Sequence, residues 1–183
     1  MVQAGSMGLP FVAVRGLIGS DILKHRPDLR VIQNPFNSRE QVVVVCPIRP
    51  DVAVFHALKA DLWGNAITPF FREDPTLARA SRLAIVTAEE IVDRPLTLKE
   101  AVPNTFIPAI DVDVVAHAPR GAHPGGLGDL YKPDHAHIME YLEAAKEGIA
   151  FQGYLDRYIR NLSNHEEYLA RVGLATARTG GAQ

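Results

Sequence analysis

Short apolar runs with little polar alternation most constrain how this chain folds. Four of them are rich in Val and Ile and are bounded by proline, aspartate or charged residues: residues 42–46, 52–56, 83–87 and 112–117. This pattern is typical of parallel strands that are buried on both faces. Residues 11–14 are predicted as a fifth strand, because Pro10 stands at its start, where a missing N–H is tolerated. The runs predict an α/β fold with a mostly parallel sheet.

Helices are predicted mainly in the C-terminal third. Asp134 is expected to cap a helix that ends near Gly148, and further helices are expected over residues 151–158 and 165–172. Earlier, Asp74-Pro75 predicts a helix over residues 76–82, and Ser20 or Asp21 is expected to cap a short helix. Residues 94–108 are interpreted as a long connection. We expect one domain over residues 1–183, with a frayed tail over 174–183.

Composition narrows the class of protein. Of the 183 residues, 47% are hydrophobic and 22% charged, as in ordinary globular proteins. The net charge is −2 and the Lys and Arg residues are scattered, so the sequence does not indicate a basic surface for binding nucleic acid. No apolar run approaches the roughly 18 residues of a membrane span, and the N-terminus lacks the basic start of a secretory signal. The single Cys46 excludes an internal disulfide and is expected to be buried, so a reduced, cytoplasmic setting is predicted.

The predicted sheet has few helices to cover it. Five parallel strands need helices on both faces, and the connections between these strands are short of helical signals. Parts of the sheet should therefore remain uncovered, unless more chain at the N-terminus or another subunit covers them.

The segment 111–126, DVDVVAHAPRGAHPGG, is the first candidate site. A buried strand ends there in a loop that contains Arg120, His123 and several Pro and Gly residues. Ligands of open parallel sheets bind beyond the carboxyl ends of the strands. The alternative is a tight turn with solvated polar side chains.

Three other groups of polar residues each have a structural alternative. His56 at a strand end could contact a ligand or be a satisfied, half-buried histidine. Asp61 and Asn65 are expected chiefly to hydrogen-bond the backbone of their loop. Of the pair Glu89 and Glu90, which could suggest acid–base chemistry, we expect one to be paired and the other solvated.

Two classes of site are not supported by the motifs. His135 and His137 stand two residues apart on a predicted helix, so they do not share a face, and we predict no metal site. No glycine-rich phosphate-binding motif and no GxSxG motif occurs.

The order of several segments resembles one known family. These segments are GLPF (8–11), NPF (34–36), PDVAVFHA (50–57), Asp61 with Gly64-Asn65, VTAEEIV (86–92), APRGAHP (118–124) and HEEYL (165–169), with a helical ending between the last two. Together they resemble the α (A) subunit of family I CoA-transferases, most closely the glutaconate type. The resemblance spans nearly the whole chain.

This resemblance implies an α/β/α subunit of the CoA-transferase-like (NagB/RpiA-like) class that works with a homologous β subunit. In the family, a glutamate attacks an acyl-CoA thioester, and CoA passes to a small carboxylic or dicarboxylic acid; in the glutaconate type this glutamate belongs to the β subunit. No catalytic residue is therefore expected in this chain, nor a permanently bound cofactor. The residues expected to line the cleft for substrate and CoA are Arg15, His56, Asn65, Arg120 and His123.

The family's α subunits also carry a Gly-rich N-terminal part that has no counterpart here. This agrees with the uncovered sheet predicted above. Two alternatives remain open: a hydrolase of CoA thioesters on the same scaffold, including ring-cleaving enzymes, and a catalytically inactive assembly module.

Overall fold

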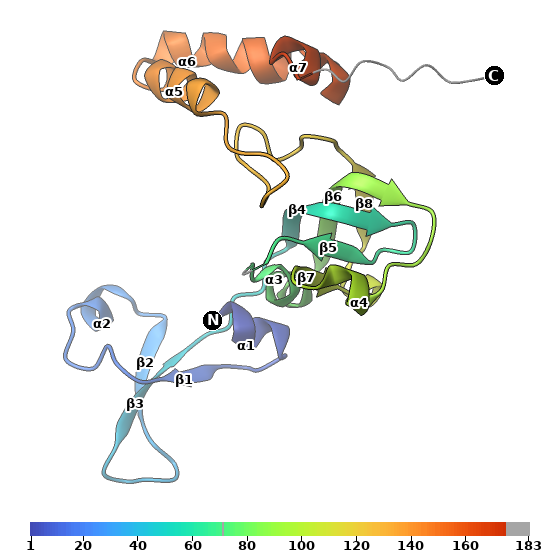
Figure 1. The fold of residues 1–183 in the computed structure, drawn as a ribbon. Helices are drawn as coiled ribbons and strands as arrows, with labels where there is room; N and C mark the ends of the chain where they lie inside the picture. Colours follow the sequence, from blue (N-terminus) through green and yellow to red (C-terminus); the bar gives the residue numbers. More distant parts are fainter. Residues whose placement is uncertain (71, 175–183) are drawn as a thin grey trace.

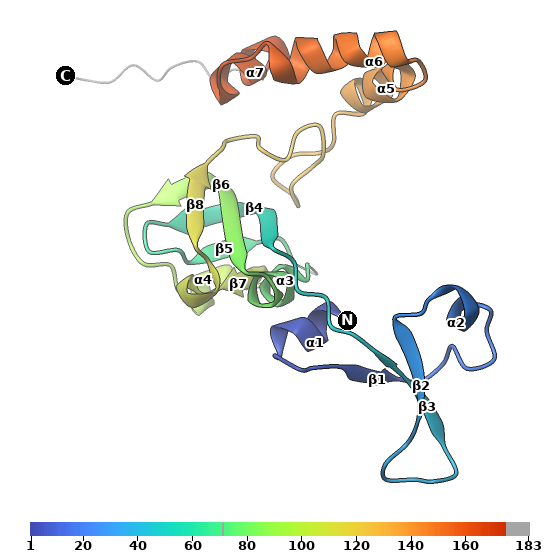
Figure 2. The ribbon, with the colours of Figure 1, turned by 180° about the vertical axis from the view of Figure 1, so that it is seen from behind.

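The computed structural model describes residues 1–70 and 72–174. A five-stranded sheet forms the centre, a small three-stranded sheet projects from one end, and a group of helices lies at the other end (Figures 1 and 2). The expected frayed tail, apart from Leu174, falls outside the described residues. No described helix is long and apolar enough to cross a membrane.

The central sheet is built on three parallel strands, β4 (Val52–Asp61), β6 (Leu83–Val92) and β8 (Val114–His117). Two short strands, β5 (Ala66–Thr68) and β7 (Thr105–Ile107), extend it antiparallel, in the order β7-β5-β4-β6-β8. The α/β class is confirmed, with a sheet that is mixed at one edge. β4 and β6 are each ten residues long, so they extend beyond the apolar runs that predicted them.

Alanines on the two longest strands, together with Phe55 and Val86, form the core. Ala53, Phe55 and Ala57 pair in register with Ala84, Val86 and Ala88, and all six are buried. Helix α3 (Asp74–Ala80) packs on this face through Ala78 and Leu77. The 3-10 turn η1 (Ala109–Asp111) leads into β8.

The opposite face of the parallel strands is partly uncovered, as the sequence predicted. Val52, Val54 and Val114 are 48%, 62% and 42% exposed. Apolar strand residues pointing to solvent are typical of parallel sheets that lack one covering layer.

The strands predicted over residues 11–14 and 42–46 do not join this sheet, so their predicted place in it was wrong. β1 (Val12–Val14) and β3 (Gln41–Val45) pair antiparallel in the separate sheet β1-β3-β2, whose third strand is β2 (Leu29–Gln33). An apolar run predicts a strand but carries no information about which partner it pairs with. Cys46 is exposed rather than buried, because β3 ends at Val45.

Residues 94–108 are more ordered than a plain connection, which corrects that interpretation. They contain α4 (Leu98–Ala101), begun by a capping box between Thr97 and Glu100, and strand β7. Both elements are too short for their periodicity to be visible in the sequence.

The helical ending agrees with the prediction. Asp134 caps α5 (His135–Ala144) by accepting a hydrogen bond from His137 N, although the helix ends at Ala144 rather than near Gly148. α6 (Gly148–Leu155) continues into the π-helical turn η2 (Asp156–Arg160), and α7 (His165–Arg171) follows.

Near the N-terminus, α1 (Val2–Ser6) packs against α3, and α2 (Ile22–His25) belongs to the projecting sheet. Gly5 of α1 lies directly against the backbone of Ile48, where an added Cβ would overlap the carbonyl oxygen. Because backbone cannot move aside as a side chain can, only glycine fits this contact.

We expect Gly5→Ala to lower the free energy of unfolding by about 1–3 kcal/mol, the usual cost of overpacking. Urea denaturation followed by circular dichroism measures it. Gly148→Ala is the matched control, since nothing lies within 4 Å of its added Cβ. Equal stability of the two variants would contradict the close contact.

Candidate functional site

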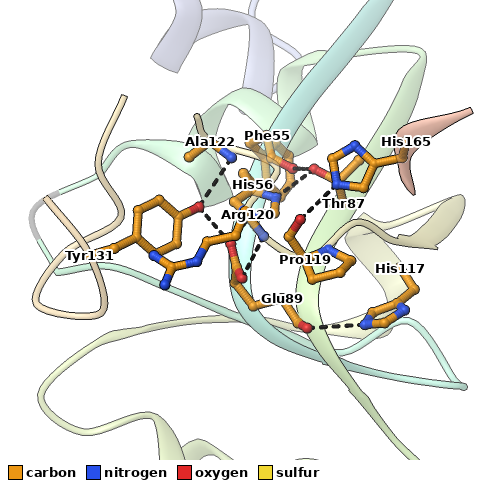
Figure 3. Close-up of polar contacts among 10 residues, drawn as sticks. All are labelled: Phe55, His56, Thr87, Glu89, His117, Pro119, Arg120, Ala122, Tyr131 and His165. Carbon is orange, nitrogen blue, oxygen red and sulfur yellow. Dashed lines mark hydrogen bonds and ion pairs between the residues drawn. The ribbon is translucent and has the colours of Figure 1, made fainter. Parts of the chain in front are cut away.

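Glu89, near the end of β6, is the centre of a polar cluster beneath the APRGAHP loop (Figure 3). Its Oε1 accepts hydrogen bonds from Tyr131 OH at 2.5 Å and His56 Nε2 at 2.7 Å. Its Oε2 accepts one from the backbone N–H of Arg120 at 2.8 Å. The carboxylate side chain is only 11% exposed. Glu89 therefore joins β4, β6 and the loop at a single point.

His56 is held within this cluster from several sides. Its Nδ1 lies 2.8 Å from Thr87 Oγ1, while Nε2 donates to the Glu89 carboxylate. Gly121 of the loop closes over the ring: an added Cβ there would stand 2.7 Å from His56 Cε1. The imidazole is thus fixed and nearly buried.

Further contacts attach the loop to the sheet and to the C-terminal helices. His117 Nε2 donates to the backbone carbonyl of Glu89 at 3.1 Å. From α7, His165 Nε2 donates to Pro119 O at 2.6 Å. His123 Nδ1 lies 2.6 Å from Tyr168 OH, and its Nε2 lies 3.3 Å from Asp134 Oδ2. The loop is therefore held between two parts of the molecule.

The ionisation of the cluster follows from these contacts. Burial alone would raise the pKa of Glu89, but the hydrogen bonds from Arg120 N–H, His56 and Tyr131 outweigh it and hold that pKa below its ordinary value. Burial, and then the bond to Glu89, raise the pKa of Tyr131. Glu89 is thus an anion with its oxygens occupied, and Tyr131 is a neutral donor.

A second titratable group lies under the C-terminal helices. Burial, followed by the nearby His123, lowers the pKa of His137. Its Nε2 lies 2.8 Å from Tyr154 OH, and its ring centroid is 5.0 Å from that of His123. Within the described residues, no three His, Cys, Asp or Glu side chains are grouped to hold a metal ion.

Arg120 carries a positive charge in this region that no carboxylate of the described residues pairs with. Its backbone lies in the left-handed region, with φ of 60°, and its guanidinium lies 4.5 Å from the centroid of the Tyr131 ring. Among the described residues its side chain forms no ion pair with a carboxylate. A planar guanidinium held in this way can bind a carboxylate or phosphate through two parallel hydrogen bonds.

A pocket of about 330 Å³ lies beside the cluster. Trp63 from the β4–β5 turn, Ile91 from β6 and His117 from β8 contribute to its walls. Pockets of this size hold small ligands, and this one shares His117 with the cluster.

The five residues predicted to line a cleft do not all meet. His56 and Arg120 are joined through Glu89, while His123 lies on the same loop but faces the helices. Arg15 lies exposed just after β1, in the projecting sheet. Asn65 lies in the β4–β5 turn, where its Nδ2 donates to Asp61 and its Oδ1 accepts from Ala109 N.

Other predictions about polar residues can also be compared with the contacts. Asp61 accepts hydrogen bonds from the backbone of its own loop, as expected. Of the two glutamates, Glu89 is paired, whereas Glu90 is 53% exposed and pairs with Lys59 on the surface. Tyr131 and Thr87 are the members of the cluster that sequence reasoning missed. Thr87 belongs to the segment VTAEEIV, but no motif or spacing in the sequence indicated Tyr131.

Comparison of the sequence with those of known proteins identifies relatives of this chain. No protein-family model matches the chain. It is 34% identical over 170 residues to the α (A) subunit of the 3-oxoadipate CoA-transferase of Pseudomonas knackmussii, and 31% identical over 194 residues to that of the glutaconate CoA-transferase of Acidaminococcus fermentans. The alignments cover 92% and 94% of this chain, and 59% of each relative.

The chain is homologous to the α (A) subunits of CoA-transferases. The crystal structure of the Acidaminococcus glutaconate enzyme superposes with a TM-score of 0.82 at 29% identity, over 94% of this chain and 59% of the other. A further relative, the cholesterol ring-cleaving hydrolase IpdA subunit of Rhodococcus jostii, is 28% identical over 93% of this chain and 60% of its own length. The resemblance and the α/β fold class predicted from the sequence are confirmed.

Proposed function

We propose that this chain is the non-nucleophilic part of a CoA-transferase. The reaction would move CoA between an acyl-CoA and a small carboxylic or dicarboxylic acid, with CoA and its thioester as substrates and no resident cofactor. The homology to the α (A) subunits of CoA-transferases supports the reaction class. The proposed setting is the cytoplasm.

The state of Glu89 supports assigning the nucleophile to a partner. A carboxylate that attacks a thioester needs an oxygen that can approach the carbonyl carbon. Both oxygens of Glu89 accept hydrogen bonds, three in all, from His56, Tyr131 and the loop backbone. Glu89 is therefore proposed to hold the loop, and the attacking glutamate to stand on a β subunit.

The unpaired guanidinium of Arg120 is the observation that carries the proposed role of the loop. A substrate acid and CoA both carry anionic groups, and Arg120 is the cation that the cluster fixes at the carboxyl ends of β6 and β8. His123 and Asn65 are proposed to shape the cleft rather than to donate to substrate, since their side-chain atoms already have partners.

We expect Arg120→Ala to raise KM for the acid or for CoA about 10- to 100-fold, since hydrogen bonds to charged groups contribute about 1.5–3 kcal/mol. The assay requires the chain together with its β-type partner and any further segment of the enzyme. The KM of Arg120→Lys should lie between those of the wild-type chain and Arg120→Ala, because lysine keeps the charge but lacks the planar guanidinium. Arg82→Ala, at an 81% exposed side chain, is the control. Unchanged kinetics for Arg120→Ala would remove this assignment.

A hydrolase is the second candidate, and the likeness to the ring-cleaving hydrolase IpdA favours keeping it. Water would then replace the acid as acceptor. Measuring free CoA release with and without added carboxylic acids separates the two: release that needs no acid indicates the hydrolase, and CoA transfer that requires the acid indicates the transferase. No turnover by the full complex would contradict both.

A further inference from the structure

The projecting N-terminal sheet, which we call the arm (residues 11–49), has one bare face. On its covered face, Leu17 and Leu23 pack against Leu29, Val43 and Val45. The register of the strands puts a second set of residues on the other face: Ala13, Arg30, Ile32, Val42 and Val44.

Helix α2 packs on the first face through Leu23, and no described helix makes more than slight contact with the strands of the arm. Ala13, Arg30 and Ile32 are exposed on this face, Ile32 by 37%, while Val42 and Val44 are half-buried. Beside the face, Phe11 at the entry to β1 is 52% exposed, and Phe36 at the tip of the hairpin is 97% exposed. An apolar sheet face left open to water is typical of an interaction surface.

The arm is also basic. Residues 11–49 contain six Lys and Arg but only three Asp and Glu. Lys24 and Arg26 pair with neighbouring aspartates. Within the part of the chain that the structure describes, Arg15, Arg30 and Arg39 have no ion pair, and Arg30 lies in the middle of the bare face. A matching surface should be apolar and carry carboxylates.

The helices at the other end of the molecule have that chemistry. From Asp134 to Arg171 the chain contains seven Asp and Glu but four Lys and Arg. Apolar side chains lie exposed among them, with Met139 61%, Leu142 49% and Ile149 91% exposed. Glu143 and Glu147, both exposed, lie close to these apolar residues in sequence. Glu143 pairs with Lys146 on the same surface, whereas Glu147 has no ion pair among the described residues.

These two complementary surfaces cannot meet within one molecule. The arm and the helices lie at opposite ends, with the central sheet between them, in both views (Figures 1 and 2). We propose that two copies of this chain pair about a two-fold axis, with the arm of each copy on helices α5 and α6 of the other. Such an arrangement is closed, and it uses both surfaces of both copies.

Reversing charge on one surface at a time tests this. Sedimentation of the full chain should show a dimer. Its dissociation constant should rise as salt is added, because salt screens the opposite charges. An arm-reversed variant, Arg30→Glu with Arg39→Glu, and a helix-reversed variant, Glu143→Lys with Glu147→Lys, should each dimerise at least tenfold more weakly. Arg82→Glu with Lys99→Glu, at exposed sites on the central part, is the matched control and should remain dimeric.

Mixing the two reversed variants gives the decisive result. In a mixed pair, one arm–helix contact has both charges reversed and the other has both charges native, so dimers should form again. Circular dichroism checks that each variant is folded. A monomeric wild-type chain, unchanged dimerisation of the reversed variants, or no recovery on mixing would each overturn the proposal. An arm that binds only a β-type partner would overturn it as well.

Discussion

Asp61→Ala is expected to lower the free energy of unfolding by about 3–5 kcal/mol. Asp61 is fully buried, and its carboxylate accepts hydrogen bonds from the backbone N–H groups of Trp63, Asn65 and Leu96 and from Asn65 Nδ2. Each donor left without an acceptor in a buried place costs about 1–3 kcal/mol. Burial alone would raise the pKa of Asp61, but these donors outweigh it and lower that pKa.

Urea denaturation compares Asp61→Ala with Asp51→Ala, which removes a carboxylate that is 88% exposed and should change stability by less than about 0.5 kcal/mol. Asp61→Asn should fall between the two, because it keeps one acceptor oxygen but turns an amide group toward the remaining donors. An Asp61→Ala variant as stable as Asp51→Ala would mean that the turn finds other acceptors.

Glu89→Ala is expected to cost about 2–4 kcal/mol and to loosen the APRGAHP loop. Its removal leaves His56 Nε2, Tyr131 OH and Arg120 N–H without their acceptor in a nearly buried place. Hydrogen exchange of the Arg120 amide reads the loop directly, and we expect its protection to fall. Glu90→Ala, at the exposed neighbouring glutamate, is the control and should leave both measurements almost unchanged.

The same carboxylate predicts a dependence on pH. Because folding lowers the pKa of Glu89, its contribution to stability is complete above the unfolded value of about 4.3, and it is lost as pH falls through the lower folded value. The difference in stability between the wild-type chain and Glu89→Gln should therefore shrink in acid. A difference that stays constant from pH 7 to pH 3 would contradict an ionised Glu89.

Local signals in the sequence were enough for the features that depend on neighbours in the chain. The Asp134 cap, the helices that follow it and the loop bonds of Asp61 each involve residues a few positions apart. The strand pairing of β1 with β3 depends on residues about thirty apart, and the apolar runs carry no partner information. Strands β5 and β7 are three residues long, too short for any period to appear.

The candidate site also has a part that the sequence predicted and a part that it did not. The sequence pointed to the loop, because an apolar run that ends in Arg, His and Pro is a local pattern, even though the strand it forms, β8, is a largely exposed edge strand. It did not show that Glu89 would be the common acceptor, because its donors are 31 to 42 residues away in the chain. Tyr131 stands in a stretch without a motif, and only the folded loop brings its hydroxyl to Glu89.

The attachment of one loop to two parts of the molecule has a consequence for how tightly a ligand is held. Glu89 ties the loop to the sheet, while His165 and Tyr168 tie it to the last helix. Shortening the chain before α7 would keep the bond from Glu89 to Arg120 but remove the second attachment, so the loop around Pro119 and His123 would gain conformational freedom. Each binding event would then have to restrict that freedom, so affinity would fall although no contacting side chain had changed.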